Sequence, residues 1–478
     1  MKKLFAIYPP GRKFMRGEER CQSNIESSTS TAIRACNDLG YLCAVMRQEG
    51  WEVRLKDFQT ESLNTDDLFA DLADFLPDVL FISVTNATLV EDLEICCMIR
   101  SKYSEIVIIL KGAVFFIPPQ EFFLREDLQC ADYLIAEEAE CIIRELLDAH
   151  YQDRSRLKTV PRIYYKEGSH WVGSENNSHM EDLDSLPFPA RDLMKNKLYV
   201  RPDTGRPMAS ISTSRGCASA CTFCMTPPMS GRKQRSRSPQ NIVAEIRECV
   251  DKYGIYDFFF RADTFTADKN QVLEVCRLLH ENKLAEKIRW VANARAVTVD
   301  AELLSAMKQA GCWLIAIGFE SGSDETLKRI RKGSTSTINL RAADLIHQAG
   351  IKLFGFYMIG FPWEDLAQIK MTEELIWKTR PDFLELHLAV PFYGTELFRE
   401  AKEMGCLKEM PLGCDYFKEV PLSSLFFTAE QLRNIRKKII NRYIYSLPYL
   451  FRRLLEVLRE PGKFMHYATH ALSLLKQK

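Results

Sequence analysis

Residues 209–224 read ASISTSRGCASACTFC, a short strand-like run that leads directly into three closely spaced cysteines. Cys217, Cys221 and Cys224 lie on one tight loop, so their thiolates can hold three irons of a four-iron cluster. The loop offers no fourth ligand, which leaves one iron free to bind another group. Zinc is the alternative, but zinc normally takes four ligands, and no further Cys or His lies nearby before Cys249.

The composition indicates a soluble globular protein of several domains. The 478 residues are 46% apolar and 27% charged, and at roughly 150 residues per domain this length predicts about three units. Sixty-four basic residues balance 64 acidic ones, so no global charge steers the protein toward nucleic acid or an anionic membrane. The first residues lack a signal-peptide core, and no apolar run is long enough to span a bilayer. We expect a cytoplasmic protein.

The chain has fifteen cysteines, an odd number, and they are scattered along its length. This pattern favours reduced thiols over a disulfide framework. Outside the loop, most cysteines fall in helix-like apolar patterns typical of small core side chains: Cys36, Cys43, Cys96, Cys97, Cys249 and Cys276. We expect these thiols to be buried and free.

Residues 1–150 alternate short apolar runs with amphipathic segments, as βαβ units do. Five strands are expected, at residues 3–8, 51–58, 79–85, 106–111 and 133–136. They predict a doubly wound, flavodoxin-like (Rossmann-type) sheet, which binds ligands beyond the carboxyl ends of its strands. The candidate ligand contacts follow those ends: Tyr8, Pro9, Thr85, Asn86, Lys111, Gly112 and Glu138. No glycine-rich dinucleotide fingerprint follows the first strand.

The rest of the chain divides into three parts. Residues 151–200 carry a polar hairpin and several prolines, which predict an ordered linker. Residues 201–398 predict an α/β unit of six strands, a partial (β/α)6 TIM-type barrel with its chemistry at the carboxyl ends of the strands. These strands are expected at residues 209–213, 256–262, 289–294, 313–319, 353–359 and 383–390. Residues 399–478 predict a helical C-terminal domain.

The cysteine loop resembles that of the radical S-adenosylmethionine (SAM) superfamily, whose pattern is C-x-x-x-C-x-aromatic-C after the first strand of such a barrel. Phe223 takes the aromatic position. The resemblance implies that Cys217, Cys221 and Cys224 hold a [4Fe–4S] cluster whose free iron chelates SAM. It also implies reductive cleavage of SAM to a 5′-deoxyadenosyl radical that abstracts a substrate hydrogen.

The resemblance continues along the later barrel strands. It implies that Asp263 lies near the methionine amino group, that Arg295, Glu320 and Ser321 serve the ribose and carboxylate, and that the motif around Ile359 backs the adenine. Without the family, each motif still places a charged or small residue at the carboxyl end of a strand, where barrel enzymes keep catalytic groups. A helix cap or a turn glycine explains any one of these motifs, but not all of them together.

The order of the domains resembles the cobalamin-binding subgroup of that superfamily, over about residues 3–460. This subgroup includes methylases of unactivated carbon or phosphorus and the anaerobic porphyrin ring cyclase, so the resemblance implies bound cobalamin. Classical cobalamin domains supply a histidine to cobalt after the first strand, whereas residues 9–13 here read PPGRK. We expect base-off cobalamin without a protein imidazole. A domain that keeps the fold but binds no corrin is the alternative.

Two further features concern the substrate. Glu385 and His387 share one face of the last barrel strand, so they are candidate catalytic groups if that face is the lumen. Residues 432–478 carry 11 basic and two acidic residues. This basic patch is either a solvated or self-packed surface, or a contact with an anionic membrane or lipid substrate.

The combined interpretation is a radical SAM enzyme that also uses cobalamin, a methyltransferase acting on an unactivated carbon of a largely apolar or polycyclic substrate. A cyclase, oxidoreductase or ring-rearranging enzyme with the same cofactors is one alternative, and a non-catalytic iron–sulfur sensor is another. The expected partners are a small-molecule or lipid-like substrate and an electron donor such as flavodoxin or ferredoxin. Nucleic acid is not expected, and peripheral membrane contact through the basic tail is a further hypothesis.

Overall fold

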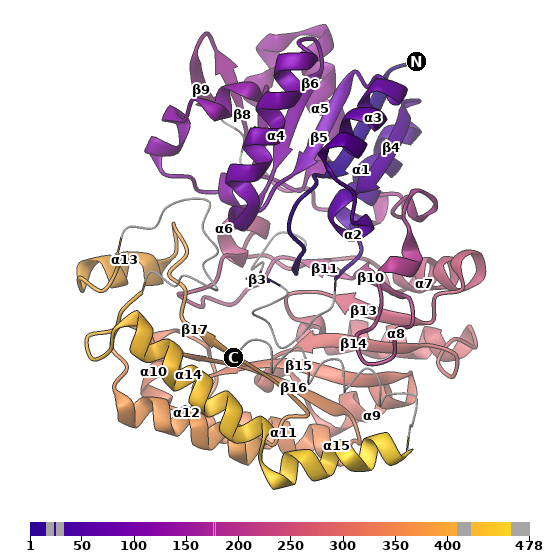
Figure 1. Ribbon diagram of the computed structural model, residues 1–478. Helices are drawn as coiled ribbons and strands as arrows, with labels where there is room; N and C mark the ends of the chain where they lie inside the picture. The colour runs from indigo at the N-terminus through magenta and orange to yellow at the C-terminus, as the bar shows by residue number, and fades with distance from the viewer. Residues whose placement is uncertain (16–22, 25–32, 175, 177, 409–421, 460–478) are drawn as a thin grey trace.

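The computed structural model describes residues 1–15, 23–24, 33–174, 176, 178–408 and 422–459. Figure 1 shows two sheets lying one above the other, each flanked by helices. A seven-stranded sheet is built from the first third of the chain and a six-stranded sheet from the middle. The predicted α/β class, with a helical C-terminus, is confirmed.

The N-terminal sheet has the strand order β4-β1-β5-β6-β7-β8-β9. Its strands are β1 (Lys3–Tyr8), β4 (Glu52–Asp57), β5 (Val79–Ser83), β6 (Val107–Lys111), β7 (Tyr133–Ile135), β8 (Ile163–Glu167) and β9 (His170–Gly173). The five predicted strands are parallel, whereas β8 and β9 pair antiparallel at the edge. The hairpin that the sequence places in the linker therefore extends this sheet.

Helices cover both faces of the N-terminal sheet. Side chains alternate across a strand, so Leu4 and Ala6 of β1 enter one core while Phe5 and Ile7 enter the other. The helices are α1 (Asn37–Gln48) and α5 (Ala139–Gln152) on the first side, and α3 (Thr65–Phe75) and α4 (Leu89–Lys102) on the second. Burial on both faces accounts for the continuous apolar runs of β5 and β6.

The six-stranded sheet is parallel throughout and follows the order of the chain, as in an open partial barrel. Its strands are β10 (Met208–Ser212), β13 (Asp257–Arg261), β14 (Arg289–Ala294), β15 (Cys312–Glu320), β16 (Lys352–Ile359) and β17 (Phe383–Leu388). The helices that pack on it are α7 (Pro239–Tyr253), α8 (Lys269–Glu281), α9 (Ala301–Gln309), α11 (Ser336–Gln348) and α12 (Leu366–Thr379). Parallel strands place all six carboxyl ends along one rim.

Short elements shape the connections of that rim. The antiparallel pair β11 (Ser214–Arg215) and β12 (Arg235–Ser236) brackets the cysteine loop and the short helix α6 (Thr226–Ser230). The remaining short elements are β2 (Phe14–Met15), β3 (Ser23–Asn24), α2 (Phe58–Glu61), α10 (Asp324–Arg329) and α13 (Glu396–Glu403).

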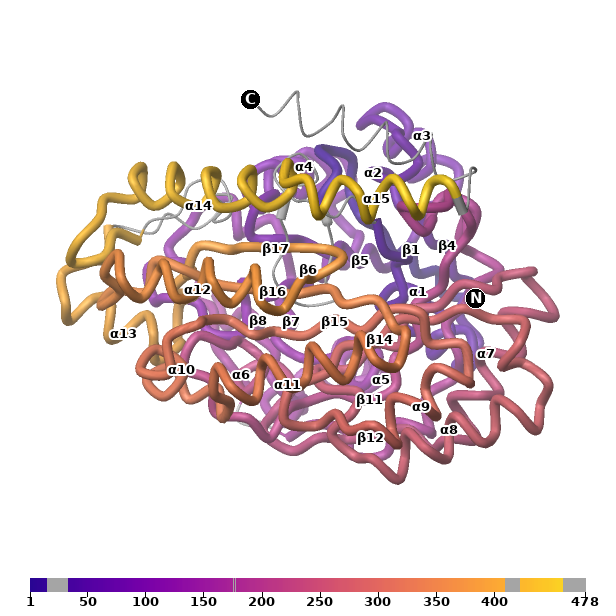
Figure 2. The backbone as a smooth tube through the Cα atoms, turned by 90° about the horizontal axis from the view of Figure 1, so that it is seen from below, coloured from indigo at the N-terminus to yellow at the C-terminus, as the bar shows by residue number. Residues whose placement is uncertain are grey.

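The described C-terminal part consists of α14 (Ala429–Ile444) and α15 (Leu447–Arg459). Helix α14 packs beside β17, and the buried Tyr443 hydroxyl donates to the carbonyl of Pro381 at 2.7 Å. Figure 2 shows α14 and α15 following each other along one side of the molecule. Across the described residues, none of the helices is both long and apolar enough to cross a membrane.

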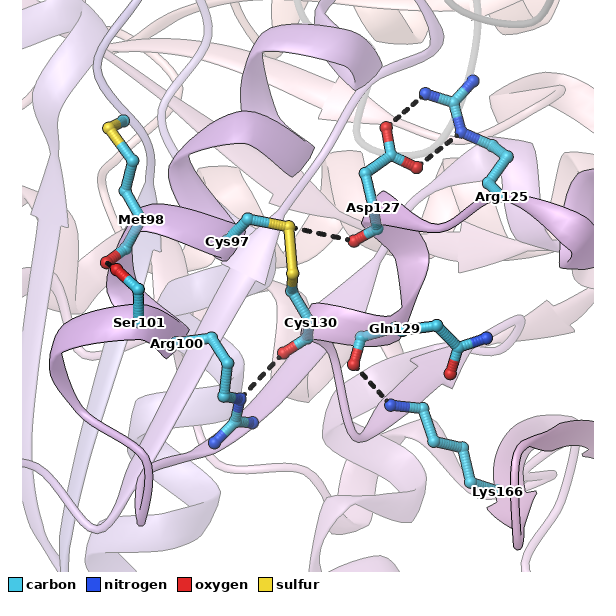
Figure 3. Close-up of a disulfide and its surroundings, with 9 residues drawn as sticks. All are labelled: Cys97, Met98, Arg100, Ser101, Arg125, Asp127, Gln129, Cys130 and Lys166. Carbon is cyan, nitrogen blue, oxygen red and sulfur yellow. Dashed lines mark hydrogen bonds and ion pairs between the residues drawn. A yellow bond between two sulfur atoms is a disulfide. The ribbon is translucent and has the colours of Figure 1, made fainter.

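The expectation that Cys97 is a free core thiol is wrong. Cys97 of α4 forms a disulfide with Cys130, which ends the 3-10 turn Asp127–Cys130 (Figure 3). The turn packs against α4, and Arg100 holds it by donating from Nε to the carbonyl of Cys130 at 3.1 Å. The two cysteines are 33 positions apart, so only tertiary packing brings them together. The other five cysteines of that group are buried and form no disulfide, as expected.

Candidate active site

A cavity of about 240 Å³ opens at the carboxyl ends of the six-stranded sheet. All three cysteines of the loop line it, together with residues that follow β13 and residues of β14, β15 and β16. The lining residues that matter below are Arg34, Cys217, Cys221, Phe223, Cys224, Asp263, Arg295, Gly318, Glu320, Lys332 and Phe356. Most of the SAM-site residues predicted from sequence therefore meet in one place.

The cysteine loop is held tightly by backbone contacts. Gly216 has φ +82°, and a Cβ there would collide with the carbonyl oxygens of Ser230 and Lys233. Only glycine fits both the conformation and the space. The amide of Cys217 donates to the carbonyl of Gly231 at 3.2 Å, and that of Thr222 to the carbonyl of Ile330 at 3.1 Å. These contacts fix the loop between α6 and α10.

The three thiols fit a cluster better than a single metal ion. Within the described residues, no three Cys, His, Asp or Glu side chains converge closely enough to hold one ion. Cysteines that each bind a different iron of a cluster need not meet at one point. Burial raises the pKa of Cys221, while Lys332 and Arg295 oppose that rise. These two cations would favour the thiolate form, which is the form that binds iron.

Lys332 is a cavity residue that the sequence interpretation missed. Its ammonium donates to Glu320 Oε1 at 2.7 Å, and both side chains are nearly buried. Glu320 has φ +62°, at a register shift between β15 and β16 that follows Gly318. A Cβ on Gly318 would collide with the Glu320 carboxylate, so the glycine makes room for the ion pair. Lys332 lies in the connection after α10, where no strand-end pattern marks it.

Two residues predicted to serve SAM lie away from the cavity lining. Ser321 is fully buried, and its hydroxyl accepts from the amide of Ser323 at 3.1 Å and contacts Thr372 Oγ1 at 3.2 Å. Ile359 is fully buried in the core of the sheet. The positive φ of Glu320 turns the chain immediately before Ser321. Ser321 therefore stabilises the loop after β15, and Ile359 packs in the hydrophobic core at the end of β16.

Phe223 joins the cysteine loop to the end of β16. Its ring packs against Phe361, with the ring centroids 6.3 Å apart. The buried Glu364 carboxylate accepts from the amides of Gly360 at 2.7 Å and Phe361 at 3.2 Å. Burial raises the pKa of Glu364 to about 7, although these hydrogen bonds oppose the rise. Glu364 thus fixes the turn on which Phe361 and Phe223 meet.

The predicted catalytic pair lies beside the cavity. Phe356 of β16 lines the cavity and stacks on His387 of β17, with centroids 6.3 Å apart and ring planes 13° apart. Burial lowers the pKa of His387, and the neighbouring Glu385 opposes that change. Arg436 of α14 approaches the same strand and donates from Nε to the carbonyl of Leu386. The C-terminal helices therefore contribute to this wall, which the sequence interpretation did not foresee.

The rim of the N-terminal sheet holds a buried acceptor that finds no partner among the described residues. Tyr8 donates from its hydroxyl to Asp38 Oδ2 at 2.9 Å, and Ser83 donates to the same oxygen at 3.3 Å. The other oxygen, Asp38 Oδ1, is buried and accepts no hydrogen bond from the described residues. A buried acceptor normally finds a donor, so this position suits a bound group with amide donors, such as the edge of cobalamin.

Other predicted contacts of this rim are largely occupied by the protein itself. Lys111 is buried, and a Cβ on Gly112 would lie 2.6 Å from the carbonyl oxygen of Val84. Thr85 caps the turn Asn86–Thr88 through a hydrogen bond from the amide of Thr88 at 3.2 Å. Pro9 is buried directly after β1. These residues shape the rim, and Asp38 is the acceptor that sequence reasoning missed.

Glu138 lies in an ion-pair cluster between the two sheets. It accepts from Arg235 at 2.7 and 3.0 Å and pairs with Arg215 at 2.9 Å, and Arg215 also pairs with Glu140. Burial by itself would raise the pKa of Glu138, but the two guanidinium groups hold it well below its usual range. Arg215 directly precedes the cysteine loop. Glu138 therefore ties the N-terminal sheet to the base of that loop.

The two rims face each other across the domain contact. Arg34 precedes α1 of the N-terminal sheet but lines the cavity. Asn37 donates from Nδ2 to the carbonyl of Ser210 in β10 at 2.6 Å. Burial lowers the pKa of Arg261 on β13 to about 10, whereas Asp263 and Tyr8 act to raise it. Tyr8 belongs to β1 of the N-terminal sheet, so the two sheets are close here. Ligands bound at the two rims would therefore be neighbours.

Comparisons with known proteins identify two domains. Residues 38–147 match the B12 binding domain and residues 211–376 match the radical SAM superfamily, together more than half of the chain. The chain is 28% identical over 409 residues to an uncharacterized methyltransferase of Pyrococcus horikoshii, covering 85% of this chain and 87% of that protein. It is 23% identical to the anaerobic magnesium-protoporphyrin IX monomethyl ester cyclase of Cereibacter sphaeroides, covering 76% of this chain and 60% of that protein.

A solved structure has the same fold across nearly the whole chain. It is the cobalamin-dependent S-adenosylmethionine radical enzyme OxsB with aqua-cobalamin and SAM bound, at a TM-score of 0.76 and 18% identity, covering 99% of this chain and 72% of that chain. The cysteine loop and the rim around Asp38 fit the two matched domains. The chain belongs to the cobalamin-dependent radical SAM enzyme family, whose cofactors are a [4Fe–4S] cluster, SAM and cobalamin.

Proposed function

We propose that this radical SAM enzyme methylates an unactivated carbon atom of a largely apolar substrate. The observation that carries the proposal is the meeting of the two rims, because Arg34 of the cobalamin domain lines the cavity that also holds the three cysteines. When bound, the cluster and SAM supply a radical that removes a hydrogen atom, and cobalamin supplies the methyl group. Methyl transfer to carbon needs both cofactors beside one substrate, and the facing rims provide for this.

The protein's own residues hold and shield these groups. Cys217, Cys221 and Cys224 would hold the cluster, and Arg295 and Lys332 would balance its charge and that of the SAM carboxylate. Arg295 lies 3.7 Å from Cys221 Sγ through Nη1 and also donates to the carbonyl of Lys332. These contacts place both cations at the cavity before any ligand binds, which lowers the cost of ordering them.

The wall formed by Phe356 and His387 favours an apolar or polycyclic substrate with one polar end. Phe356 offers a flat apolar surface to the cavity, while His387, Glu385 and Arg436 lie beside it on β17 and α14. We propose that this group of three receives the polar end of the substrate. A one-electron reductant, such as flavodoxin or ferredoxin, would complete the reaction.

The test is an anaerobic assay with reconstituted enzyme, a reductant and SAM labelled with deuterium in its methyl group. A panel of isoprenoid and tetrapyrrole compounds serves as candidate substrates. The expected product carries one labelled methyl group, and 5′-deoxyadenosine and S-adenosylhomocysteine accumulate with it. Product of unlabelled mass formed with 5′-deoxyadenosine alone would instead support a cyclase or oxidoreductase, the alternative favoured by the likeness to the cyclase.

A pair of variants tests the substrate wall. His387→Ala should lower product formation far more than 5′-deoxyadenosine formation, because it leaves the cysteine loop and Lys332 in place. His280→Ala is the matched control, since His280 is exposed at the end of α8. Equal loss of both products in H387A would contradict a role confined to the substrate.

A further inference from the structure

Helix α15 turns its apolar side away from the protein. Its exposed large apolar residues recur at the spacing of one helical face: Leu447, Leu450, Phe451, Leu454, Leu455 and Leu458. Leu447 is 83% exposed, Phe451 61% and Leu458 66%. Surface helices normally bury such a stripe against the core. We call these six residues the α15 stripe.

The outward direction of the stripe is fixed by contacts on the opposite side of the helix. Arg453 forms an ion pair with Asp382 at 3.0 Å, and Tyr449 donates from its hydroxyl to the carbonyl of Asp382 at 3.3 Å. Glu456 pairs with Lys352 at the start of β16. The polar side of α15 is therefore bound to the sheet, and the helix cannot turn its stripe inward without breaking these partly buried contacts.

Positive charge accompanies the stripe. Arg433, Lys437 and Lys438 of α14 are exposed, and none of them pairs with an acidic residue in the described part of the chain. Both views show α14 and α15 following each other along one side of the molecule (Figures 1 and 2). Leu425 and Phe426, just before α14, add exposed apolar area at 58% and 57%.

We propose that α14 and α15 together bind the surface of an anionic lipid bilayer. Amphipathic helices with a basic part and an apolar side lie in the plane of the interface, with the apolar side among the acyl chains. Each basic side chain near anionic headgroups adds further attraction. A second copy of this chain suits the surface less well, because a two-fold contact would bring the cations of α14 near one another. The proposal does not depend on the proposed function.

Flotation with lipid vesicles tests the proposal on the full-length protein. We expect the protein to float with vesicles that contain phosphatidylglycerol and to remain in solution with pure phosphatidylcholine. Leu454→Glu combined with Leu458→Glu should lower binding at least tenfold. Replacing Arg433, Lys437 and Lys438 together by Gln should also lower vesicle binding at least tenfold, since each basic residue near the surface adds about fivefold to the affinity. The binding that remains should depend less on salt.

Leu76→Glu combined with Leu124→Glu is the matched control, because both leucines are exposed, at 63% and 81%, on the N-terminal domain. This control should bind like the wild type, and circular dichroism should show all variants folded. Binding that survives both the stripe and the charge variants would overturn the proposal. So would a dimer in the absence of lipid that the stripe variant disperses, or binding by a chain ended at Arg459 but not by the full chain.

Discussion

In both sheets the carboxyl ends of the parallel strands carry charged residues, but these residues have different surroundings at the two rims. At the six-stranded sheet, charged residues at the strand ends line an accessible cavity, as Asp263, Arg295 and Glu320 do. At the N-terminal sheet, Glu138 is instead joined to arginines of the other domain. A charged residue at a strand end is therefore accessible to a ligand where the rim opens to a cavity, and it connects the domains where the rim meets another domain.

Removal of the three cysteines should have the largest effect, because it destroys the centre of the open rim. The triple variant Cys217→Ala, Cys221→Ala, Cys224→Ala should retain no cluster iron and form no 5′-deoxyadenosine. Iron and sulfide analysis after anaerobic reconstitution measures this. Cys406→Ala is the control, because Cys406 is buried outside the cavity. Cluster iron retained by the triple variant would contradict the assignment.

Loss of one partner in the ion-pair cluster should destabilise the connecting rim strongly. Glu138→Gln would leave Arg235 and Arg215 poorly paired in a buried place, which typically costs about 3–5 kcal/mol. Urea unfolding at pH 7 measures the change. Glu181→Gln is the matched control, since its ion pair with Lys233 is 63% and 74% exposed and should therefore contribute far less to stability.

The ion pairs of Glu138 with Arg215 and Arg235 should make the stability of the protein depend on pH. The arginines lower the pKa of Glu138 in the folded protein, so the stability it adds is present at neutral pH. That stability is lost as the pH falls through the normal carboxyl range toward the lowered value. The difference between wild type and E138Q should therefore narrow in acid. A constant difference from pH 7 to pH 3 would show that Glu138 does not act as a charged partner.

A variant of Asp38 tests whether the N-terminal rim binds a ligand, in addition to connecting the domains through Glu138. Asp38→Ala should weaken cobalamin binding about tenfold, the scale of one charge-assisted hydrogen bond. Equilibrium dialysis against hydroxocobalamin measures this, while SAM cleavage reports on the other rim. Glu94→Ala, exposed on α4, is the control. Unchanged cobalamin affinity in D38A would place the corrin elsewhere.

Glu364, which is buried behind the open rim, should give a pH dependence opposite in sign to that of Glu138. Burial raises its pKa to about 7, so the folded state keeps a proton that the unfolded state loses near pH 4.3. Stability should therefore fall as the pH rises from about 5 to about 7. Glu364→Gln should remove this part of the fall, whereas Glu325→Gln should not. Parallel pH profiles for wild type and E364Q would contradict the raised pKa.

Sequence reasoning performed best where a pattern is local. The cysteine loop, the five parallel strands of the first sheet and the six of the second follow from spacing and apolar runs. It performed less well for residues whose role depends on a distant partner. Lys332, Arg34 and Asp38 reach their sites through tertiary contacts, and Ser321 turns away because Glu320 adopts a positive φ.

The sequence by itself determined the class of fold, the loop of three closely spaced cysteines and the strand-end positions, because these depend on short-range periodicity and side-chain chemistry. Only the tertiary structure decided which strand-end side chains line a cavity and which form ion pairs between the domains. It also decided that Cys97 meets Cys130 and that α15 presents its apolar side outward. These outcomes depend on which distant segments pack together, and the local spacing of residues does not predict that packing.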